Sequence, residues 1–168
     1  MLVAKKSKHS HAGTPALVAL EKAGVEHEVL TYTHDPDSGL AFGIEAAREI
    51  GIDPDLVYKT LLARVDGTLV VGIVPVNRKL DLKALASAVG GKKAAMAEPA
   101  DAERATGYVV GGISPLGQRQ RHATVLDASA ADHERVYVSG GRRGLDVGLA
   151  PRDLVALTGA RTAAIARG

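Results

Sequence analysis

The feature that most constrains this chain is the glycine-rich stretch at residues 107–117, which reads GYVVGGISPLG. Its first half, Tyr108–Val110, combines one aromatic with two β-branched residues and predicts a short buried strand. Pro115 cannot continue that strand, and the glycines tolerate positive φ. We expect the next backbone amides to converge on an oxyanion or carbonyl; they belong to Gly112, Ile113 and Ser114. The alternative is a simple tight turn after a core strand.

Composition limits the classes of function that are open to the chain. Its 168 residues suffice for one domain with a sizeable core, and contents of 46% hydrophobic and 24% charged residues are ordinary for a globular protein. Aromatic residues make up only 3%, so a surface that stacks several exposed bases lacks the side chains it needs. The lack of cysteine excludes a disulfide framework, a cysteine nucleophile and a thiolate metal site. With no apolar run of membrane-spanning length and no pattern of a secretion signal, the expected location is the cytoplasm.

Positive charge is modest in total but gathered in a few places. The net charge of +2 neither demands nor excludes nucleic acid as a partner. Residues 1–13 contain several lysines and are expected to form a flexible basic arm. The arginines in and after the glycine-rich loops are candidates for a rim that faces phosphate groups; they are Arg119, Arg121, Arg142 and Arg143. The alternative for each pair is a solvated turn.

Caps and turns divide residues 14–168 into short elements. Thr14 and Pro15 predict a helix start, Gly24 predicts its end, and Asp66–Gly67 predicts a hairpin. Other helices are expected at 44–50, 82–89, 99–105 and 153–158, with a helical turn at 54–57. Strands are expected at 26–32 (an edge strand), 61–65 (entered through 58–60), 68–76, 92–97, 124–127, 135–139, 145–149 and 161–166. Since strands outnumber helices and hairpins mix with crossovers, we predict one α+β domain with a mixed, barrel-like sheet flanked by helices.

The sequence offers no self-contained catalytic group. Ser114 lacks the final glycine of a nucleophile elbow, and the histidines offer no metal-ligand pair at helical spacing. Lys59 stands where a helical turn becomes a largely apolar strand, and a lysine there is not expected to be fully buried without a partner. The alternative for Lys59 is a surface lysine whose stem covers apolar surface. The pattern favours binding and positioning of a substrate over attack by the protein itself.

Several blocks in unbroken order resemble one known family. The blocks are VYKTL (57–61), LDLK (80–83), KKA (92–94), TGY (106–108), GGISPLGQ (111–118) and VSGGRRGLD (138–146). Together they closely resemble the YbaK branch of the prolyl-tRNA-synthetase-associated editing family, the free-standing Cys-tRNA(Pro) deacylases. The resemblance extends from Thr14 to about Arg167, and it depends on the ordered set because no single block is decisive.

The resemblance implies a hydrolase that removes cysteine mischarged onto tRNA(Pro), with prolyl-tRNA synthetase as a transient partner. It implies no cofactor and no metal, and a homo-oligomer is an open possibility. Lys59 matches the family's essential lysine, and Gly111 with Pro115 matches its Gly-x-x-x-Pro loop, which binds the terminal nucleotide and the ester. The other positions that the resemblance places around the pocket are Tyr32, Phe42, Thr60, Ser139 and Asp146. In this family the cysteine thiol of the substrate attacks its own ester carbonyl.

The chain departs from the family pattern at His122–Ala123, where the pattern has an apolar residue followed by proline. The loop after Gln118 is therefore expected to be more mobile. Two alternatives for the function stay open. One is the sister Ala-tRNA(Pro) deacylase, in which a bound water attacks, and the other is a non-catalytic member that binds tRNA or the synthetase.

Overall fold

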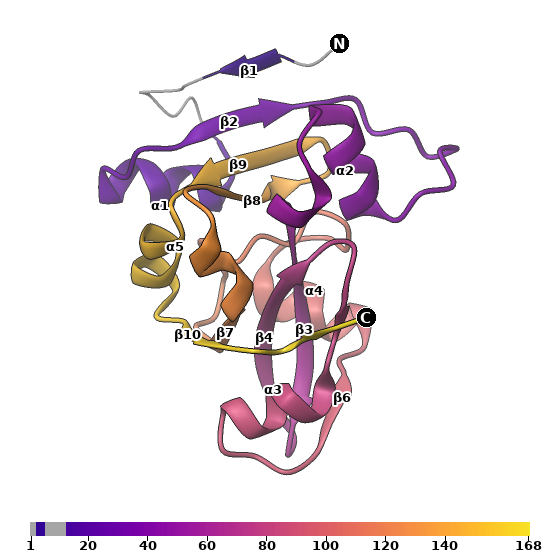
Figure 1. The fold of residues 1–168 in the computed structure, drawn as a ribbon, viewed down its shortest axis with the longest axis vertical. Helices are drawn as coiled ribbons and strands as arrows, with labels where there is room; N and C mark the ends of the chain where they lie inside the picture. The colour runs from indigo at the N-terminus through magenta and orange to yellow at the C-terminus, as the bar shows by residue number, and fades with distance from the viewer. Residues whose placement is uncertain (1–2, 6–12) are drawn as a thin grey trace.

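The computed structural model describes residues 3–5 and 13–168, which form eleven strands and five α-helices (Figure 1). The helices are α1 (Pro15–Ala23), α2 (Phe42–Ile50), α3 (Leu82–Ala88), α4 (Pro99–Thr106) and α5 (Pro151–Thr158). Two short 3-10 segments are η1 (Pro54–Leu56) and η2 (Ala128–Asp132). The predicted mixed α+β architecture is confirmed.

The strands form three sheets. The first has the order β1-β2-β9-β8 and is antiparallel throughout; its strands are Val3–Lys5, Glu28–Thr31, Leu145–Leu149 and Val136–Arg142. The second has the order β10-β7-β4-β3-β6, with strands Arg161–Ala163, Ala123–Asp127, Thr68–Pro75, Tyr58–Val65 and Ala94–Met96. The pairs β10–β7 and β7–β4 are parallel and the others antiparallel. A small ribbon pairs β5 (Lys79–Leu80) with β11 (Ala166–Arg167).

Several boundaries follow the cap and turn residues of the sequence. The hydroxyl of Thr14 accepts a hydrogen bond from the N–H of Leu17 at 3.3 Å, and Gly24 ends α1 with φ +65°. Asp66 and Gly67 both have positive φ, as a two-residue hairpin turn requires. The predicted start and end of α1 and the β3–β4 hairpin are therefore confirmed.

Tyr108–Val110 does not form a strand, which corrects the prediction made from its composition. The side chains of α4 explain the difference. The N–H of Tyr108 donates to the hydroxyl of Thr106 at 3.2 Å, and the N–H of Val110 donates to Glu103 Oε2 at 2.9 Å. Because nearby side chains accept from these amides, the segment needs no neighbouring strand.

The two ends of the chain also differ from the expected pattern. In the predicted basic arm, β1 pairs with β2, so β2 is not an edge strand; residues 1–2 and 6–12 lie outside the described residues. The predicted strand at 161–166 is two strands, because the Oδ1 atom of Asp127 accepts from the N–H groups of Ile165 and Ala166 at 2.9 and 3.0 Å. At this bend the chain leaves the five-stranded second sheet (the central sheet), so β11 pairs with β5 instead.

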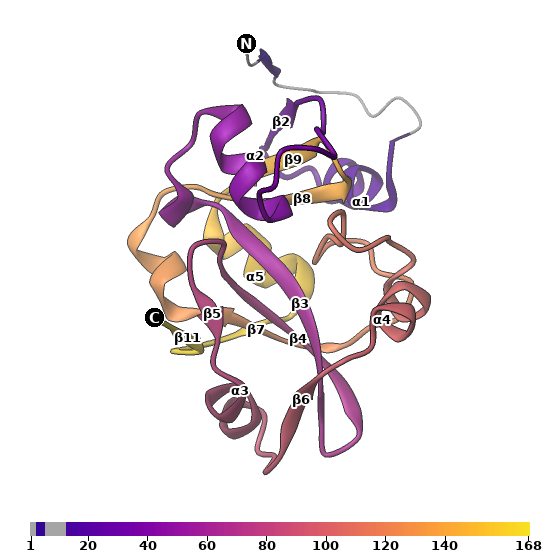
Figure 2. The same ribbon diagram turned by 90° about the vertical axis from the view of Figure 1, so that its right-hand side faces the viewer.

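The main core lies between the first two sheets and the helices α1, α4 and α5. Tyr58 and Leu62 of β3, Val138 of β8, Val147 of β9 and Leu154 of α5 are among its buried residues. Figure 2 shows α2 beside the upper end of β3, whereas α4 lies apart from this strand on the right of the picture. The start of β3 is thus placed next to α2. In the described part of the chain, no helix combines the length and apolar character needed to cross a membrane.

Candidate active site

A cavity of about 350 Å³ lies around the start of β3. Its wall includes the N-terminal end of α2 and parts of the glycine-rich loop, β8 and β9. Eight of the residues that were predicted as site residues line it: Tyr32, Phe42, Lys59, Thr60, Gly111, Ile113, Ser139 and Asp146. The fold therefore brings together side chains that are far apart in the sequence, around a wall that also contains the apolar residues Val57, Leu62 and Val76.

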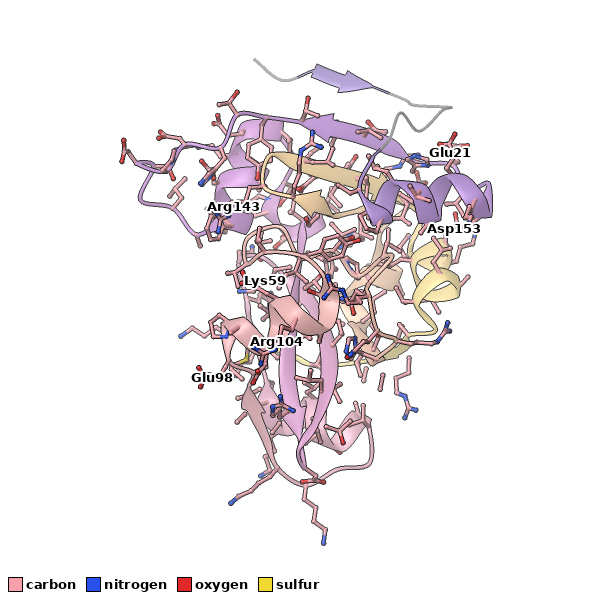
Figure 3. All side chains as sticks on the ribbon, turned by 180° about the vertical axis from the view of Figure 1, so that it is seen from behind. Glu21, Lys59, Glu98, Arg104, Arg143 and Asp153 are labelled. Carbon is pink, nitrogen blue, oxygen red and sulfur yellow. The ribbon has the colours of Figure 1, made fainter. Side chains whose placement is uncertain are left out.

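Lys59 supplies a positive charge to this cavity. It lies on β3 opposite Val74, half-buried, and it can be followed in Figure 3 on the same side of the molecule as Arg143. Burial of its ammonium group lowers the pKa of Lys59, and the nearby charge of Lys79 lowers it further. Among the described residues no carboxylate forms an ion pair with Lys59. Its three donors are thus available to a ligand.

Thr60, the next residue, adds a buried hydroxyl. Thr60 is only 8% exposed, and its Oγ1 has no hydrogen-bond partner among the described residues. Val57, just before β3, forms a bridge with Tyr137, and β6 pairs with β3 from Ala63 onward. Thr60 lies between these two pairings. Since buried hydroxyls are normally satisfied, this one is suited to a ligand in the cavity.

Asp146 adds a carboxyl group to the wall of the cavity. It lies on β9 between Leu30 of β2 and Ser139 of β8, and it is 6% exposed. Burial raises the pKa of Asp146 to about 7. Burial, together with the charge of Asp146, raises the pKa of the neighbouring Tyr32 to about 12. The tyrosine is therefore a neutral donor at physiological pH, while the carboxyl group titrates near neutrality.

The Gly-x-x-x-Pro loop (residues 111–115) presents only part of itself to the cavity. Gly111 and Ile113 line the wall, but the other three predicted residues of the loop are buried behind it. The N–H of Gly112 donates to the carbonyl of Val109 at 2.8 Å, which corrects the expectation of three free amides. Among the described residues nothing accepts from the amides of Ile113 and Ser114. Of these two residues only Ile113 lines the cavity, so one of the three expected amides remains for a substrate oxygen.

Ser114 serves the loop rather than the cavity. It is fully buried, its Oγ accepts from the N–H of Leu116 at 3.2 Å, and its carbonyl accepts from Gln118 Nε2 at 2.9 Å. Pro115 is buried beside it. Ser114 and Pro115 therefore fix the shape of the loop, and the structure does not bring them to the cavity wall.

The four candidate arginines do not form one rim. Arg119 donates to the carbonyl of Arg104 at 3.4 Å, and Arg121 lies beside Gly159 at the end of α5. Arg142 is exposed at the end of β8, where it pairs with Leu145 of β9. Arg143, in the turn that follows, donates to a backbone carbonyl in the glycine-rich stretch, so the two neighbouring arginines have different surroundings.

Sequence reasoning missed Glu45, a fully buried carboxylate in α2. Its oxygens bind His34 Nδ1 at 2.6 Å and the N–H of Asp35 at 2.8 Å. The ring of His34 packs against that of Phe42, with 5.4 Å between centroids. Glu45 thus fixes the loop that leads into α2, and with it the position of Phe42. The available signal was a glutamate next to alanines on the buried face of a helix. In the described residues, no group of three or more histidines and carboxylates is placed to hold a metal ion.

A family model described as the aminoacyl-tRNA editing domain matches residues 42–157, which contain most of the cavity wall. The chain belongs to this family. The relationship expected from the ordered sequence blocks is confirmed. The matched region of this editing domain runs from the start of α2 to α5, and most of the site described above lies within that region.

Individual relatives of this editing domain agree with that assignment. A protein of Enterococcus faecalis, provisionally named the Cys-tRNA(Pro)/Cys-tRNA(Cys) deacylase EbsC, is 34% identical over 159 residues, which cover 94% of this chain and 96% of that protein. The proline–tRNA ligase of Maridesulfovibrio salexigens is 31% identical over 104 residues, or 60% of this chain and 17% of the ligase. A crystal structure provisionally described as a trans-editing enzyme for prolyl-tRNA synthetase superposes with a TM-score of 0.76 at 26% identity, over 92% of this chain and 96% of that one. The predicted editing-domain fold is confirmed.

Proposed function

We propose that this editing domain acts as a free-standing deacylase that hydrolyses Cys-tRNA(Pro), breaking the ester between the cysteinyl carbonyl and the terminal ribose. The observation that carries the proposal is the cavity itself, in which the unpaired Lys59 lies with Gly111 and Ile113 of the Gly-x-x-x-Pro loop. The relative named as a Cys-tRNA(Pro)/Cys-tRNA(Cys) deacylase covers nearly the whole chain, which supports the same substrate class.

The nucleophile in this proposal is the thiol of the substrate. The sequence has no cysteine, and Ser114 is buried behind the cavity wall. The thiol sulfur attacks the ester carbonyl of its own cysteine, so an S–C bond forms and the C–O bond to the ribose breaks. The thiol proton ends on the ribose oxygen, and water then opens the thiolactone to free cysteine. Holding thiol and carbonyl in attack geometry contributes on the order of 7–11 kcal/mol to such a step.

The residues of the cavity have distinct roles in this reaction. Lys59 binds the aminoacyl-adenosine end as a compact charge, and the free amide of Ile113 polarises the carbonyl as negative charge develops. Asp146, as a carboxylate, pairs with the α-ammonium group of the cysteine. Thr60 donates or accepts one further hydrogen bond in the same cavity.

Prolyl-tRNA synthetase is the partner that we propose for selection of the tRNA. A segment similar to this chain occurs within a proline–tRNA ligase, which supports a link between the two activities. The net charge of only +2 and the separated arginines favour weak contact with the tRNA body. The synthetase would then deliver the mischarged tRNA.

Deacylation assays with Cys-, Ser- and Ala-charged tRNA(Pro) test the proposal. Cys-tRNA(Pro) is expected to react fastest, and Ser-tRNA(Pro) much more slowly because an alcohol ionises far less readily than a thiol. Ala-tRNA(Pro), which carries no nucleophile, is expected to be nearly inert. Removal of alanine as fast as cysteine would favour attack by a bound water instead. Binding of charged tRNA(Pro) without any deacylation would identify a non-catalytic member.

A further inference from the structure

We propose that Arg143 is a positioning residue that holds the Gly-x-x-x-Pro loop against the cavity, and that it does not bind tRNA phosphate. This proposal builds on the deacylase function proposed above. It concerns the contact between two segments that are more than 25 residues apart, the glycine-rich stretch and the β8–β9 turn.

The guanidinium group of Arg143 makes two hydrogen bonds to one carbonyl. Its Nε and Nη2 atoms donate to the carbonyl of Val110 at 3.0 and 2.7 Å. The N–H of Val110 is bound in turn by Glu103 of α4 at 2.9 Å. Both backbone polar groups of Val110, the residue just before Gly111, are therefore occupied by side chains from different parts of the fold.

The same guanidinium group also lies over an aromatic ring of the cavity wall. Its Cζ is 4.6 Å from the centroid of the Phe42 ring, whose other neighbour is His34. Gly111 fits tightly between these groups. A Cβ atom at Gly111 would lie 2.8 Å from both Arg143 Nε and the Phe42 ring, and its φ of +90° also favours glycine. The β8–β9 turn, α2 and the loop therefore meet at Arg143.

Arg142 provides the contrast that separates positioning from phosphate binding. It is exposed, and in the described structure its side chain makes no hydrogen bond or ion pair. Arg143 is also exposed, but two of its donors bind the carbonyl of Val110, and one face of its guanidinium group packs on the ring of Phe42. A phosphate would have to compete with these contacts at Arg143, whereas Arg142 is free to bind one.

Loss of Arg143 is expected to affect the chemical step rather than tRNA binding. Without it the carbonyl of Val110 loses both donors, and the amide of Ile113 at the cavity wall loses its fixed direction. Misplacement of such groups by about 1 Å can cost about 100-fold in rate. A lysine at this position has one ammonium group and no planar face, so it can replace only part of the contact.

The test uses the full chain with Cys-tRNA(Pro), measuring kcat and KM for Arg143→Ala, Arg143→Lys and Arg142→Ala. Arg143→Ala is expected to lower kcat by about 10- to 100-fold with KM changed less than about twofold, and Arg143→Lys to recover part of the loss. Arg142→Ala is expected to raise KM and to lower the salt dependence of tRNA binding by about one charge. Arg48→Ala, which removes an exposed charge of α2 that pairs with the neighbouring Glu49, controls for net charge.

Hydrogen exchange of the loop provides a readout that does not depend on activity. The amides of residues 111–114 are expected to exchange faster in Arg143→Ala than in wild type, and unchanged in Arg48→Ala. Unchanged exchange, or a rise in KM with kcat retained, would overturn the positioning role. If the wild-type protein fails to deacylate Cys-tRNA(Pro), the proposed function fails, but the exchange experiment still decides whether Arg143 holds the loop.

Discussion

At the scale of single residues, the site depends on charged groups that are partly removed from water. Lys59 and Asp146 have opposite charges, and each has a pKa shifted toward its neutral form by burial. The pKa of such a group shifts back strongly when a ligand supplies an opposite charge. The shifted pKa values also make the stability of the protein depend on pH.

Asp146 is expected to make the protein less stable as the pH rises. Its pKa is about 7 in the folded state and near 4 when unfolded, so between these values the folded state binds more protons. The free energy of unfolding therefore falls from about pH 4 to pH 7 and is then constant for this group. Asp146→Asn removes the effect. Urea unfolding at pH 5 and pH 8 should show the variant gaining on the order of 2–4 kcal/mol relative to wild type; an equal difference at both pH values would contradict it.

Lys59→Ala is expected to lower kcat for Cys-tRNA(Pro) by at least about 100-fold, because it removes a charge aimed at the reacting end of the substrate. The melting temperature should change little, since a half-buried lysine at a cavity edge contributes little packing. Arginine should restore only part of the rate because its planar fork does not replace a compact ammonium group. Near-wild-type turnover of the alanine variant would exclude the assigned role.

At the scale of elements, the glycine-rich stretch shows what a sequence can and cannot predict. Caps and hairpin residues act locally, so Thr14, Gly24 and Asp66–Gly67 were sufficient to place their elements. The prediction of a strand at Tyr108–Val110 was wrong because the amides of Tyr108 and Val110 donate to the side chains of Thr106 and Glu103. The composition of the segment does not reveal these hydrogen bonds.

The candidate site was predictable only in part, for the same reason. The resemblance named seven of the eight predicted residues that line the cavity, and the pattern of the glycine-rich loop named the eighth, Ile113. The loop pattern also named Gly112 and Ser114, and the resemblance named Pro115, all of which lie behind the wall. Which side of a loop faces a cavity depends on contacts with distant segments. Glu45 was missed because nothing in its local sequence shows that His34 and Asp35 fold back onto it.

Ser114→Ala provides the prediction for this loop. The hydroxyl accepts one hydrogen bond, from the N–H of Leu116, so its loss should cost about 1 kcal/mol of stability. Deacylation should be retained at a substantial level, because Ser114 is not the nucleophile. Mass spectrometry of the enzyme quenched during turnover should show no covalent aminoacyl adduct, and an adduct on Ser114 would refute the thiol mechanism.

At the scale of the whole molecule, the net positive charge is too small, and the arginines too far from one another, for tight binding of tRNA. We expect the isolated protein to bind tRNA(Pro) weakly and to lose affinity steeply between low and physiological salt, as roughly four or five phosphate contacts would imply. Filter binding against other tRNAs at several salt concentrations measures this. Tight and selective binding of tRNA(Pro) at physiological salt would show that the synthetase is not needed for selection.

The contacts of Asp127 join two segments that are far apart in the sequence. Ile165 is fully buried in the hydrophobic cluster that includes Leu85 and Ala86 of α3, its carbonyl accepts from the N–H of Asp81 at 2.7 Å, and its amide is bound by Asp127. A chain cut by a protease just before Ile165 would leave Asp127 Oδ1 without its two backbone donors and the cluster without one of its fully buried side chains. Proteolysis at this point would therefore loosen the central sheet from the side away from the editing cavity.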